Sequence, residues 1–353
     1  MARVDLNDLN VEIGGNSILS GVSLTVEDGE CLALLGPSGC GKTTTLRAIA
    51  GFVRLKQGVV QIGPRRVDLL PPHKRNVGLV FQDYALFPHM TVTENVAYGL
   101  RMRGIDRSKI HTTVKDSLAM VQLADMGERY PEELSGGQRQ RVGLARAIVV
   151  KPDVLLLDEP LGALDRKLRD EMQVELKRLQ RDLGITTIIV THDQEEALSL
   201  SNRVAVMFRG SIAAVASPTE LYQRPHTAEI MAFLGRANFF EAWRQAGSGT
   251  LHYATSLGIS LQMPEPPANP PPSRMRVGIR PEHVRVRPGV PDASQGESGA
   301  VINEVIYRGS SAELVLQAGD SQVFSADVRT ADFLLRRGDS VAVRFPAQHA
   351  VVF

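Results

Sequence analysis

The segment Gly36–Thr43 constrains the fold of this chain more than any other stretch of the sequence. It reads Gly-Pro-Ser-Gly-Cys-Gly-Lys-Thr, the spacing of a P-loop, whose glycines allow backbone N–H groups to converge on phosphate oxygens. The apolar run Cys31–Leu35 before it predicts a buried strand, and Thr43–Ala50 after it predicts a helix that Gly51 closes. A strand, a glycine-rich turn and a helix in this order favour a phosphate-binding loop over a chance glycine turn.

The chemistry of this loop assigns candidate nucleotide contacts. The Lys42 ammonium would reach the β- and γ-phosphates, and the Thr43 hydroxyl would bind Mg²⁺. The predicted contacts are Gly36, Pro37, Ser38, Gly39, Cys40, Gly41, Lys42, Thr43 and Thr44.

Length and composition narrow the class of protein. The 353 residues are enough for two domains, each with its own core. A net charge of +1 gives no reason to expect nucleic acid as a partner, and we predict none. The two cysteines, Cys31 and Cys40, fit a reducing compartment. The N-terminus lacks the apolar core of a signal peptide, and no apolar run reaches the roughly 18 residues of a membrane span. We therefore expect contact with a membrane only through another protein.

A second motif follows the apolar run Val154–Leu157. There Asp158 and Glu159 form a carboxylate pair at the end of a predicted buried strand. Asp158 would hold Mg²⁺ through water, and Glu159 would polarise an attacking water. Alone, such a pair is more often a solvated strand end. Downstream of a P-loop, the catalytic interpretation is favoured.

The pattern along the chain predicts an α/β P-loop NTPase domain that includes a helical subdomain. Residues 65–150 are rich in helix signals, and strand and helix patterns alternate from Val154 onwards. Arg166–Leu183 reads as an amphipathic helix and Ile185–Thr191 as a β-branched strand. Ser217-Pro218-Thr219-Glu220 has the spacing of a capping box and predicts a helix start.

The composition changes near Gly235, where short strand-like pieces separated by turn residues begin. They predict a small all-β domain, so we expect an ATPase-like domain over residues 1–235 and a β domain over 236–353. Pro264–Pro272 reads as an exposed, polyproline-like loop. The predicted strands are Arg276–Arg280, Val284–Val286, Val301–Tyr307, Leu314–Leu316 and Val341–Phe345.

The segment Leu134-Ser135-Gly136-Gly137-Gln138 decides among P-loop proteins, because it resembles the signature of the ABC ATPase family. Ser135 reads as the N-cap of a helix over Gln138–Val149. The resemblance implies that Ser135, Gly136, Gly137 and Gln138 contact the γ-phosphate of ATP bound by the opposite subunit.

Three further positions agree with the family in order and spacing. Gln82, after the predicted strand Val77–Phe81, resembles the Q-loop glutamine that touches Mg²⁺ and senses the membrane partner. Asp165, in Leu161–Asp165, resembles the D-loop residue at the dimer interface, and His192 resembles the switch histidine on the γ-phosphate. Taken singly, each is more often structural. Together with Lys42 and Glu159, they resemble a complete ATPase site.

The stretch Asn76–Leu100 resembles importers whose ATPase carries a C-terminal regulatory domain, including those for sugars, polyamines, iron and phosphonates. In that group the segment forms a groove for a coupling helix of the permease, so we expect permease contacts in the Gln82–Leu100 region. A role in the core is an equal alternative for each candidate groove wall. These are Ala85, Leu86, Phe87, Met90 and Val96.

The C-terminal region supports the same resemblance, and one position departs from it. Gly278–Glu282 is similar to the family's β module of the oligonucleotide-binding-fold (TOBE) type, which implies regulation and subunit contacts. The family places an aromatic residue against adenine shortly before the second strand. Ile13 stands there in this chain, and no Phe, Tyr or Trp precedes Phe52. Ile13 would contact the base without aromatic stacking.

The resemblance implies a mechanism and a location. Two copies of the chain would pair head to tail around two ATP molecules, and hydrolysis would drive import through a separate permease at the cytoplasmic face of the inner membrane. The asparagine-led stretch Asn238–Glu241 looks most like the polyamine branch, with iron or phosphonate as alternative cargo and sugars less favoured.

Two other classes of protein are disfavoured. A soluble ABC ATPase of DNA repair or translation would carry coiled-coil arms or tandem ATPase units, and the sequence has neither. A non-enzymatic protein that retains the fold would not need Lys42, Asp158, Glu159 and His192 together.

Overall fold

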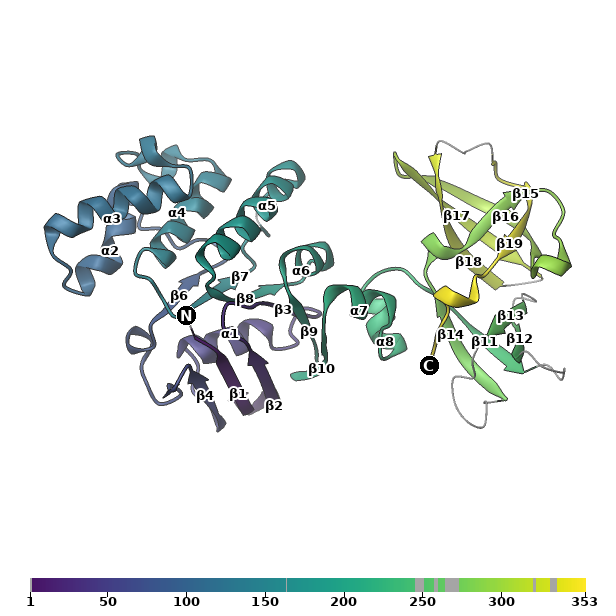
Figure 1. The fold of residues 1–353 in the computed structure, drawn as a ribbon, viewed down its shortest axis with the longest axis horizontal. Helices are drawn as coiled ribbons and strands as arrows, with labels where there is room; N and C mark the ends of the chain where they lie inside the picture. Colours follow the sequence, from purple (N-terminus) through teal and green to yellow (C-terminus); the bar gives the residue numbers. More distant parts are fainter. Residues whose placement is uncertain are drawn as a thin grey trace. The chain divides into compact units, whose positions relative to one another are not determined.

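The computed structural model describes residues 2–162, 164–244, 251–256, 260–263, 273–319, 322–330 and 335–353. The chain divides into two compact units, Met1–Pro218 and Thr219–Phe353 (Figure 1). The proline-rich segment Pro264–Pro272, expected to be an exposed loop, lies outside the described residues.

A six-stranded sheet forms the centre of the first unit, in the order β10-β9-β3-β8-β7-β6. Neighbouring strands from β9 to β6 pair in parallel, and β10 pairs antiparallel at the edge. The strands are β3 (Cys31–Leu35), β6 (Val77–Val80), β7 (Val154–Asp158), β8 (Thr186–Thr191), β9 (Arg203–Phe208) and β10 (Ser211–Ala216). The strands predicted at Cys31–Leu35, Val77–Phe81, Val154–Leu157 and Ile185–Thr191 are therefore confirmed to within one residue at each end.

Both faces of this sheet are buried, which explains why its strands are apolar throughout instead of alternating. In β7, Leu155 and Leu157 belong to a core shared with Met172 and Leu176 of α5 (Arg166–Leu183). The intervening Val154 and Leu156 belong to a second core, which includes Leu46 and Ile49 of α1 (Lys42–Ala50). Figure 1 shows α5 and α1 on opposite sides of the sheet.

An antiparallel sheet in the order β2-β1-β4-β5 completes the second core. Its strands are β1 (Val4–Ile13), β2 (Asn16–Val26), β4 (Gln57–Ile62) and β5 (Arg65–Arg66). Buried Val22, Leu24 and Val26 alternate with side chains that are exposed or half-buried, as predicted for a half-buried strand.

The helical subdomain consists of α2 (Val92–Met102), α3 (Arg107–Met120) and α4 (Gly136–Ile148), which pack on one another. It is inserted between β6 and β7, two strands that are neighbours in the sheet. The helix predicted over Gln138–Val149 is confirmed, with Ser135 as its N-cap. The remaining elements of this unit are α6 (Gln194–Leu200) and the 3-10 turns η1 (Pro72–Lys74), η2 (Ala124–Met126) and η3 (Pro131–Glu133).

The second unit consists mainly of two antiparallel five-stranded sheets around one core, as the predicted OB-like β domain requires. Phe345 lies at its centre, 5.0 Å from the Phe240 ring and 5.5 Å from the Phe324 ring. One sheet has the order β13-β12-β11-β14-β20, with β11 (Asn238–Arg244), β12 (Leu251–Thr255), β13 (Ser260–Met263), β14 (Arg274–Ile279) and β20 (Val351–Val352). The other has the order β15-β19-β16-β17-β18, with β15 (Arg285–Pro288), β16 (Ser298–Tyr307), β17 (Ser311–Ala318), β18 (Gln322–Arg329) and β19 (Ser340–Arg344). The 3-10 turns η4 (Pro281–His283), η5 (Ala293–Gln295) and η7 (Ala347–His349) connect the strands.

Two short helices, α7 (Pro218–Gln223) and α8 (Ala228–Phe233), lie at the division between the units. Buried Arg280 binds them to the β domain, because its guanidinium donates to the carbonyls of Tyr222 (3.2 Å), Met231 (3.4 Å) and Arg236 (3.2 Å). By its packing, the second compact unit therefore starts at Thr219, and the domain boundary expected near Gly235 stays a prediction. The helix start predicted at Ser217–Glu220 is found at Pro218.

Replacing Arg280 with Met should destabilise the second unit by about 3 kcal/mol, because the carbonyls of Tyr222, Met231 and Arg236 would lose a charged donor. The only tryptophan of the chain, Trp243, lies in β11, so its fluorescence during urea unfolding reports on this unit. Arg285→Met, at an exposed position of β15, is the matched control and should leave the midpoint unchanged. Equal midpoints for both variants would contradict the assignment of Arg280.

Candidate functional site

Four predicted motifs meet because they follow four neighbouring parallel strands. The strands β3, β8, β7 and β6 lie side by side, so their carboxyl ends form one edge of the sheet. The glycine-rich loop follows β3, and His192 follows β8. Asp158 and Glu159 stand at the end of β7, and Gln82 comes after β6.

The glycine-rich loop is shaped by close backbone contacts. A Cβ atom on Gly36 would lie 2.3 Å from the Met207 carbonyl oxygen, so only glycine fits there. Gly41 has a φ of 104° and caps α1 without a side-chain hydrogen bond, which leaves the N–H groups of the first turn without a side-chain acceptor. The Lys42 ammonium donates to the carbonyls of Gly36 (2.8 Å) and Pro37 (3.0 Å). Phosphate oxygens are the natural acceptors for both kinds of donor.

Thr43 and Asp158 meet beside this loop. The Thr43 hydroxyl donates to Asp158 Oδ1 at 3.0 Å. Asp158 is buried, and burial raises the pKa of its carboxyl, while the Thr43 hydrogen bond and the charges of Arg47 and Lys42 oppose that shift. A divalent cation would restore the charge that burial disfavours.

Gln82 and His192 both contact the Glu159 carboxylate. Gln82 Nε2 donates to Glu159 Oε2 at 3.0 Å, and His192 Nδ1 lies 3.1 Å from Glu159 Oε1. The Glu159 backbone has a φ of 47°, a costly conformation for a residue that precedes proline. Its N–H donates to the Val190 carbonyl at 2.9 Å, which ties it to β8. Three segments distant in sequence thus converge on one carboxylate.

Ser135–Gln138 form the N-terminus of α4. Ser135 Oγ accepts from the Gln138 N–H (3.3 Å), and Gln138 Oε1 accepts from the Ser135 N–H (2.8 Å), a reciprocal capping box. A Cβ atom on Gly137 would lie 3.0 Å from Leu168, and one on Gly136 would lie 3.6 Å from Leu164. Asp165 caps the adjacent α5 through the Leu168 N–H. The signature segment and the start of α5 therefore pack together.

The expected permease segment, Gln82–Leu100, is held by two polar side chains, of which Asn95 is buried and Arg146 half-buried. Asn95 bonds the backbone of Phe87, Met90 and Thr91, and Arg146 donates to the carbonyls of Tyr84 (2.7 Å) and Ala85 (2.8 Å). Ala85 is exposed, and Phe87 and Met90 are half-buried, so all three remain candidate groove walls. Val96 is fully buried in the core and Leu86 packs on the same core, so for these two the alternative role in the core is the one that the structure favours.

Ile13 ends β1, and its side chain is 52% exposed. Such exposure leaves an apolar surface that a flat base could cover.

Mg²⁺ fits the side chains at this site. The Thr43 hydroxyl, the Asp158 carboxylate and the Gln82 amide oxygen are hard oxygen donors, the kind that Mg²⁺ prefers. No cluster of three or more His, Cys, Asp or Glu residues able to hold a metal occurs within the described ranges. A Mg²⁺ ion bound with phosphates does not require such a cluster, because one or two carboxylates together with the phosphate oxygens and water are enough to hold it.

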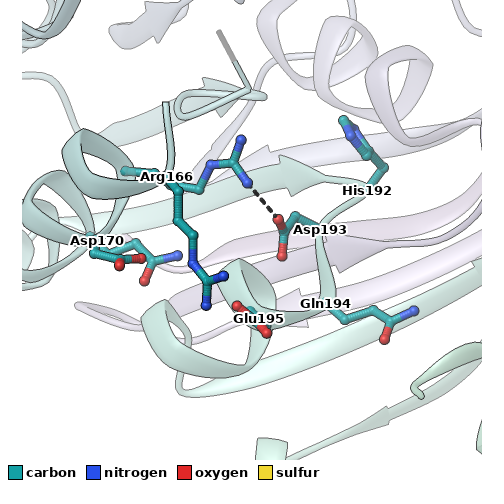
Figure 2. Close-up of a pocket in the computed structure, with 8 residues that line it drawn as sticks. Arg166, Asp170, His192, Asp193, Gln194 and Glu195 are labelled. Carbon is teal, nitrogen blue, oxygen red and sulfur yellow. Dashed lines mark hydrogen bonds and ion pairs between the residues drawn. The ribbon is translucent and has the colours of Figure 1, made fainter. Parts of the chain in front are cut away.

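Sequence analysis missed the residues that support this site. Asn95 and Arg146 bind the backbone of the segment that follows Gln82. Glu196 accepts a hydrogen bond from Thr191, the residue directly before His192. The spacing Asp193-x-x-Glu196 ahead of an apolar run is a capping signal that could have drawn attention to Glu196. Beside His192 lies an open depression of about 430 Å³ (Figure 2).

Comparison with known proteins identifies relatives of this chain. Residues 19–162 match the family model described as ABC transporter, and residues 277–353 match the TOBE domain. A spermidine/putrescine import ATP-binding protein of Marinobacter nauticus is 45% identical over 349 residues, 96% of this chain and 92% of that protein. One of Thermobifida fusca is 43% identical, over 94% of this chain and 87% of that protein. An uncharacterized ABC transporter ATP-binding protein of Escherichia coli is also 43% identical, over 94% of this chain and 91% of that protein.

Of the helices in the described ranges, none has both the length and the apolar character that a bilayer crossing requires.

Replacing Gly41 with Ala should weaken nucleotide binding at least tenfold. The new Cβ atom would lie 2.6 Å from Leu19 Cδ2 at a φ of 104°, so the loop must open. A tenfold loss of ATP affinity corresponds to about 1.4 kcal/mol, which is within the roughly 1–3 kcal/mol that a strained backbone conformation costs. Titration calorimetry with ATP measures it, and Gly104→Ala is the control, because Gly104 also has a positive φ but nothing within 4 Å. Equal affinity for wild type and Gly41→Ala would contradict this account of the loop.

Proposed function

The chain belongs to the ABC transporter family of ATP-binding proteins, and from that premise we propose that it hydrolyses ATP to energise polyamine import through a separate permease. The ATPase activity follows from the family. The observation that carries the mechanism is the Glu159 carboxylate shared by Gln82 and His192, beside the Thr43–Asp158 pair.

Glu159 is the catalytic base of this proposal. Its carboxylate stands at the end of β7 next to Asp158, where it can take the proton of a water that attacks the γ-phosphate. In this proposal His192 orients Glu159 and contacts the γ-phosphate. Gln82 donates a hydrogen bond to the same carboxylate, so a shift of the segment that contains Gln82 would move Glu159 as well. Lys42 exchanges its carbonyl acceptors for the β- and γ-phosphates. The glycine-rich loop, from Gly36 to Thr44, supplies the backbone N–H donors.

Thr43, Asp158 and Gln82 hold Mg²⁺ in this proposal. The ion supplies neutralisation of phosphate charge when it is bound. The chain's own contribution is to present three oxygen donors at the edge of the sheet where the phosphates bind, with Asp158 kept buried.

Two copies of the chain complete each site. Ser135 and Gln138 satisfy one another in a capping box, so α4 presents the remaining N–H groups of its first turn to an anion outside the helix. We assign that anion to the γ-phosphate bound by a second copy, with Gly136, Gly137 and Asp165 beside it. Residues 1–235 contain every proposed nucleotide contact. Residues 236–353 form the TOBE-type β domain that we propose for regulation and subunit contacts.

The permease binds the Gln82–Leu100 region, and the chain is peripheral to the cytoplasmic face of the inner membrane. Asn95 and Arg146 hold this region rigid, while exposed Ala85 and half-buried Phe87 and Met90 offer an apolar surface. Displacement of this segment moves Gln82, which is bonded to Glu159. Permease position and hydrolysis are thereby coupled.

Polyamine is the proposed cargo because the relatives named for spermidine and putrescine import align over nearly the whole chain. Iron and phosphonate are alternative cargoes. A soluble ATPase of DNA repair or translation is the alternative function, and no observation favours it.

Replacing Glu159 with Gln should lower ATP hydrolysis at least about a hundredfold, because an amide of the same shape accepts no proton. ATP affinity should persist, and an ATP-loaded dimer should elute early in size-exclusion chromatography. Glu195→Gln, at an exposed position, is the control. In vesicles that contain the complete transporter, Glu159→Gln should also abolish spermidine uptake.

Several outcomes would contradict this proposal. Near-normal turnover of Glu159→Gln would remove Glu159 from its role as the base. A variant that stays monomeric with ATP would contradict the composite site. Uptake of an iron chelate or a phosphonate, without uptake of spermidine, would replace the cargo.

Ile13 predicts weak discrimination among bases. Aromatic stacking on adenine is worth on the order of 1 kcal/mol, so without it GTP hydrolysis should come within roughly tenfold of ATP hydrolysis. Ile13→Tyr should tighten ATP binding by up to a factor of about 10. Calorimetry with ATP and GTP measures both, and Ile105→Tyr, at another exposed isoleucine, is the control. Strong ATP preference in the wild type, unchanged by Ile13→Tyr, would refute a base contact at Ile13.

A further inference from the structure

His192 stands in a loop whose backbone is fixed on both sides by side chains. Thr191 ends β8 directly before it, and Asp193 caps α6 directly after it through the Glu196 N–H (3.1 Å). The Asp193 N–H also donates to Thr191 Oγ1 at 2.9 Å, so the loop closes on itself around His192. Figure 2 shows His192 and Asp193 in this loop and Gln194 and Glu195 in the first turn of α6 that follows.

Glu196 completes this arrangement from the interior. Its side chain does not reach back to the Asp193 N–H, as the partner in a capping box would. Instead, Glu196 Oε2 accepts a hydrogen bond from the Thr191 hydroxyl. Glu196 is only 2% exposed, and its other oxygen, Oε1, has no hydrogen-bond partner among the described residues. A buried carboxyl with a single partner is costly, so its presence requires an explanation.

We infer that Glu196 is a positioning residue, whose ionised carboxylate holds Thr191 and with it the loop that aims His192 at Glu159. A charged acceptor makes the Thr191 hydrogen bond shorter and roughly twice as strong as a neutral one. Because Thr191 Oγ1 accepts from the Asp193 N–H as well, that bond fixes the backbone on both sides of His192. The inference rests on the role of His192 in hydrolysis proposed above.

The surroundings of Glu196 place its ionisation near neutral pH. Burial raises the pKa of Glu196 to about 7, and the negative charge of Asp193 raises it further. The Thr191 hydrogen bond and the positive charges of Arg169 and His192 lower this pKa and so limit the rise. Arg169 reaches the loop from α5 and pairs with Asp193 (Nη1 to Oδ2, 3.3 Å), the dashed line in Figure 2. β3, which packs on α6, adds no charged side chain, and burial raises the pKa of its Cys31 thiol to about 12, so that it stays neutral.

These surroundings give activity and stability opposite dependences on pH. Above about pH 7 the carboxylate is ionised and holds the loop, so it supports hydrolysis. The folded-state pKa is raised, so between about 4.5 and 7 the folded chain binds more protons than the unfolded chain, and the contribution of Glu196 to stability falls as pH rises. If Glu196 only stabilised the fold, ATP hydrolysis and the free energy of unfolding would change in the same direction with pH.

Replacing Glu196 with Gln tests the inference in the full chain. The amide can still accept from Thr191 but is neutral at every pH, so the variant matches the protonated wild type. With a pKa of about 7, Glu196 is about nine-tenths protonated at pH 6 and about nine-tenths ionised at pH 8. The ratio of kcat, variant to wild type, should fall from near one at pH 6 to about one-fifth or less at pH 8. The KM for ATP should be unchanged, and thermal unfolding at pH 8 should show a variant at least as stable as the wild type.

Two controls separate positioning from other effects. Glu195→Gln, on the exposed side of the same turn, should give a ratio near one at both pH values. Thr191→Val removes the hydroxyl that links Glu196 to the loop, so it should lower kcat at pH 8 as Glu196→Gln does. In a His192→Ala background, Glu196→Gln should cause no further loss, because the two residues act through one group.

The outcomes distinguish this inference from the proposed function. If His192→Ala hydrolyses ATP like the wild type, the proposed role of His192 fails, and the inference fails with it. If His192→Ala is slow but the Glu196→Gln ratio is the same at pH 6 and pH 8, only the inference is overturned. A further loss in the His192→Ala background would likewise overturn it.

Discussion

Parallel pairing of β3, β8, β7 and β6 is the constraint on which the rest of this site depends. Apolar side chains of these strands pack into a core on each face of the sheet, which leaves little room for polar chemistry along their length. The polar groups of the site lie at or just after the carboxyl end of each strand, and parallel pairing brings all four of these ends to one edge. The contacts of Glu159 with Gln82 and His192 are a consequence of strand order, because β7 lies between β6 and β8.

How far the sequence predicts this structure depends on the range of the interaction. The capping of α4 by Ser135 was predicted because it needs only residues three apart, and Gly51 closing α1 is equally local. The contacts of Gln82 and His192 with Glu159 were not predicted, since strand order is not encoded in any local pattern, and the resemblance to a family implied only that these residues belong to one site. The site roles stay predictions. For Val96 the alternative role in the core holds, because the resemblance that implied a groove does not show which apolar side chains of the segment the core covers.

The second unit shows the same limit. The composition changes near residue 235, and no local pattern announces that Arg280 binds the carbonyls of Tyr222 and Met231 from more than forty positions away. The helices α7 and α8 therefore pack with the β domain, although their composition differs from that of its strands. The strand β11 was overlooked, although Phe240 lies in the core, because Asn238–Glu241 was considered only for its resemblance to polyamine importers. Long-range polar contacts escape an analysis of local pattern, while buried strands mostly do not.

The insertion of α2, α3 and α4 between two paired strands has a mechanical consequence. The chain leaves the sheet after β6 and returns at β7. The three helices are therefore attached to the sheet by two covalent tethers that lie next to each other. Apolar side chains of these helices join the core beneath the sheet, and the helices take no part in the β6–β7 ladder. One of the two tethers contains Gln82. Through the Gln82–Glu159 hydrogen bond, that tether is linked directly to the carboxylate at the end of β7.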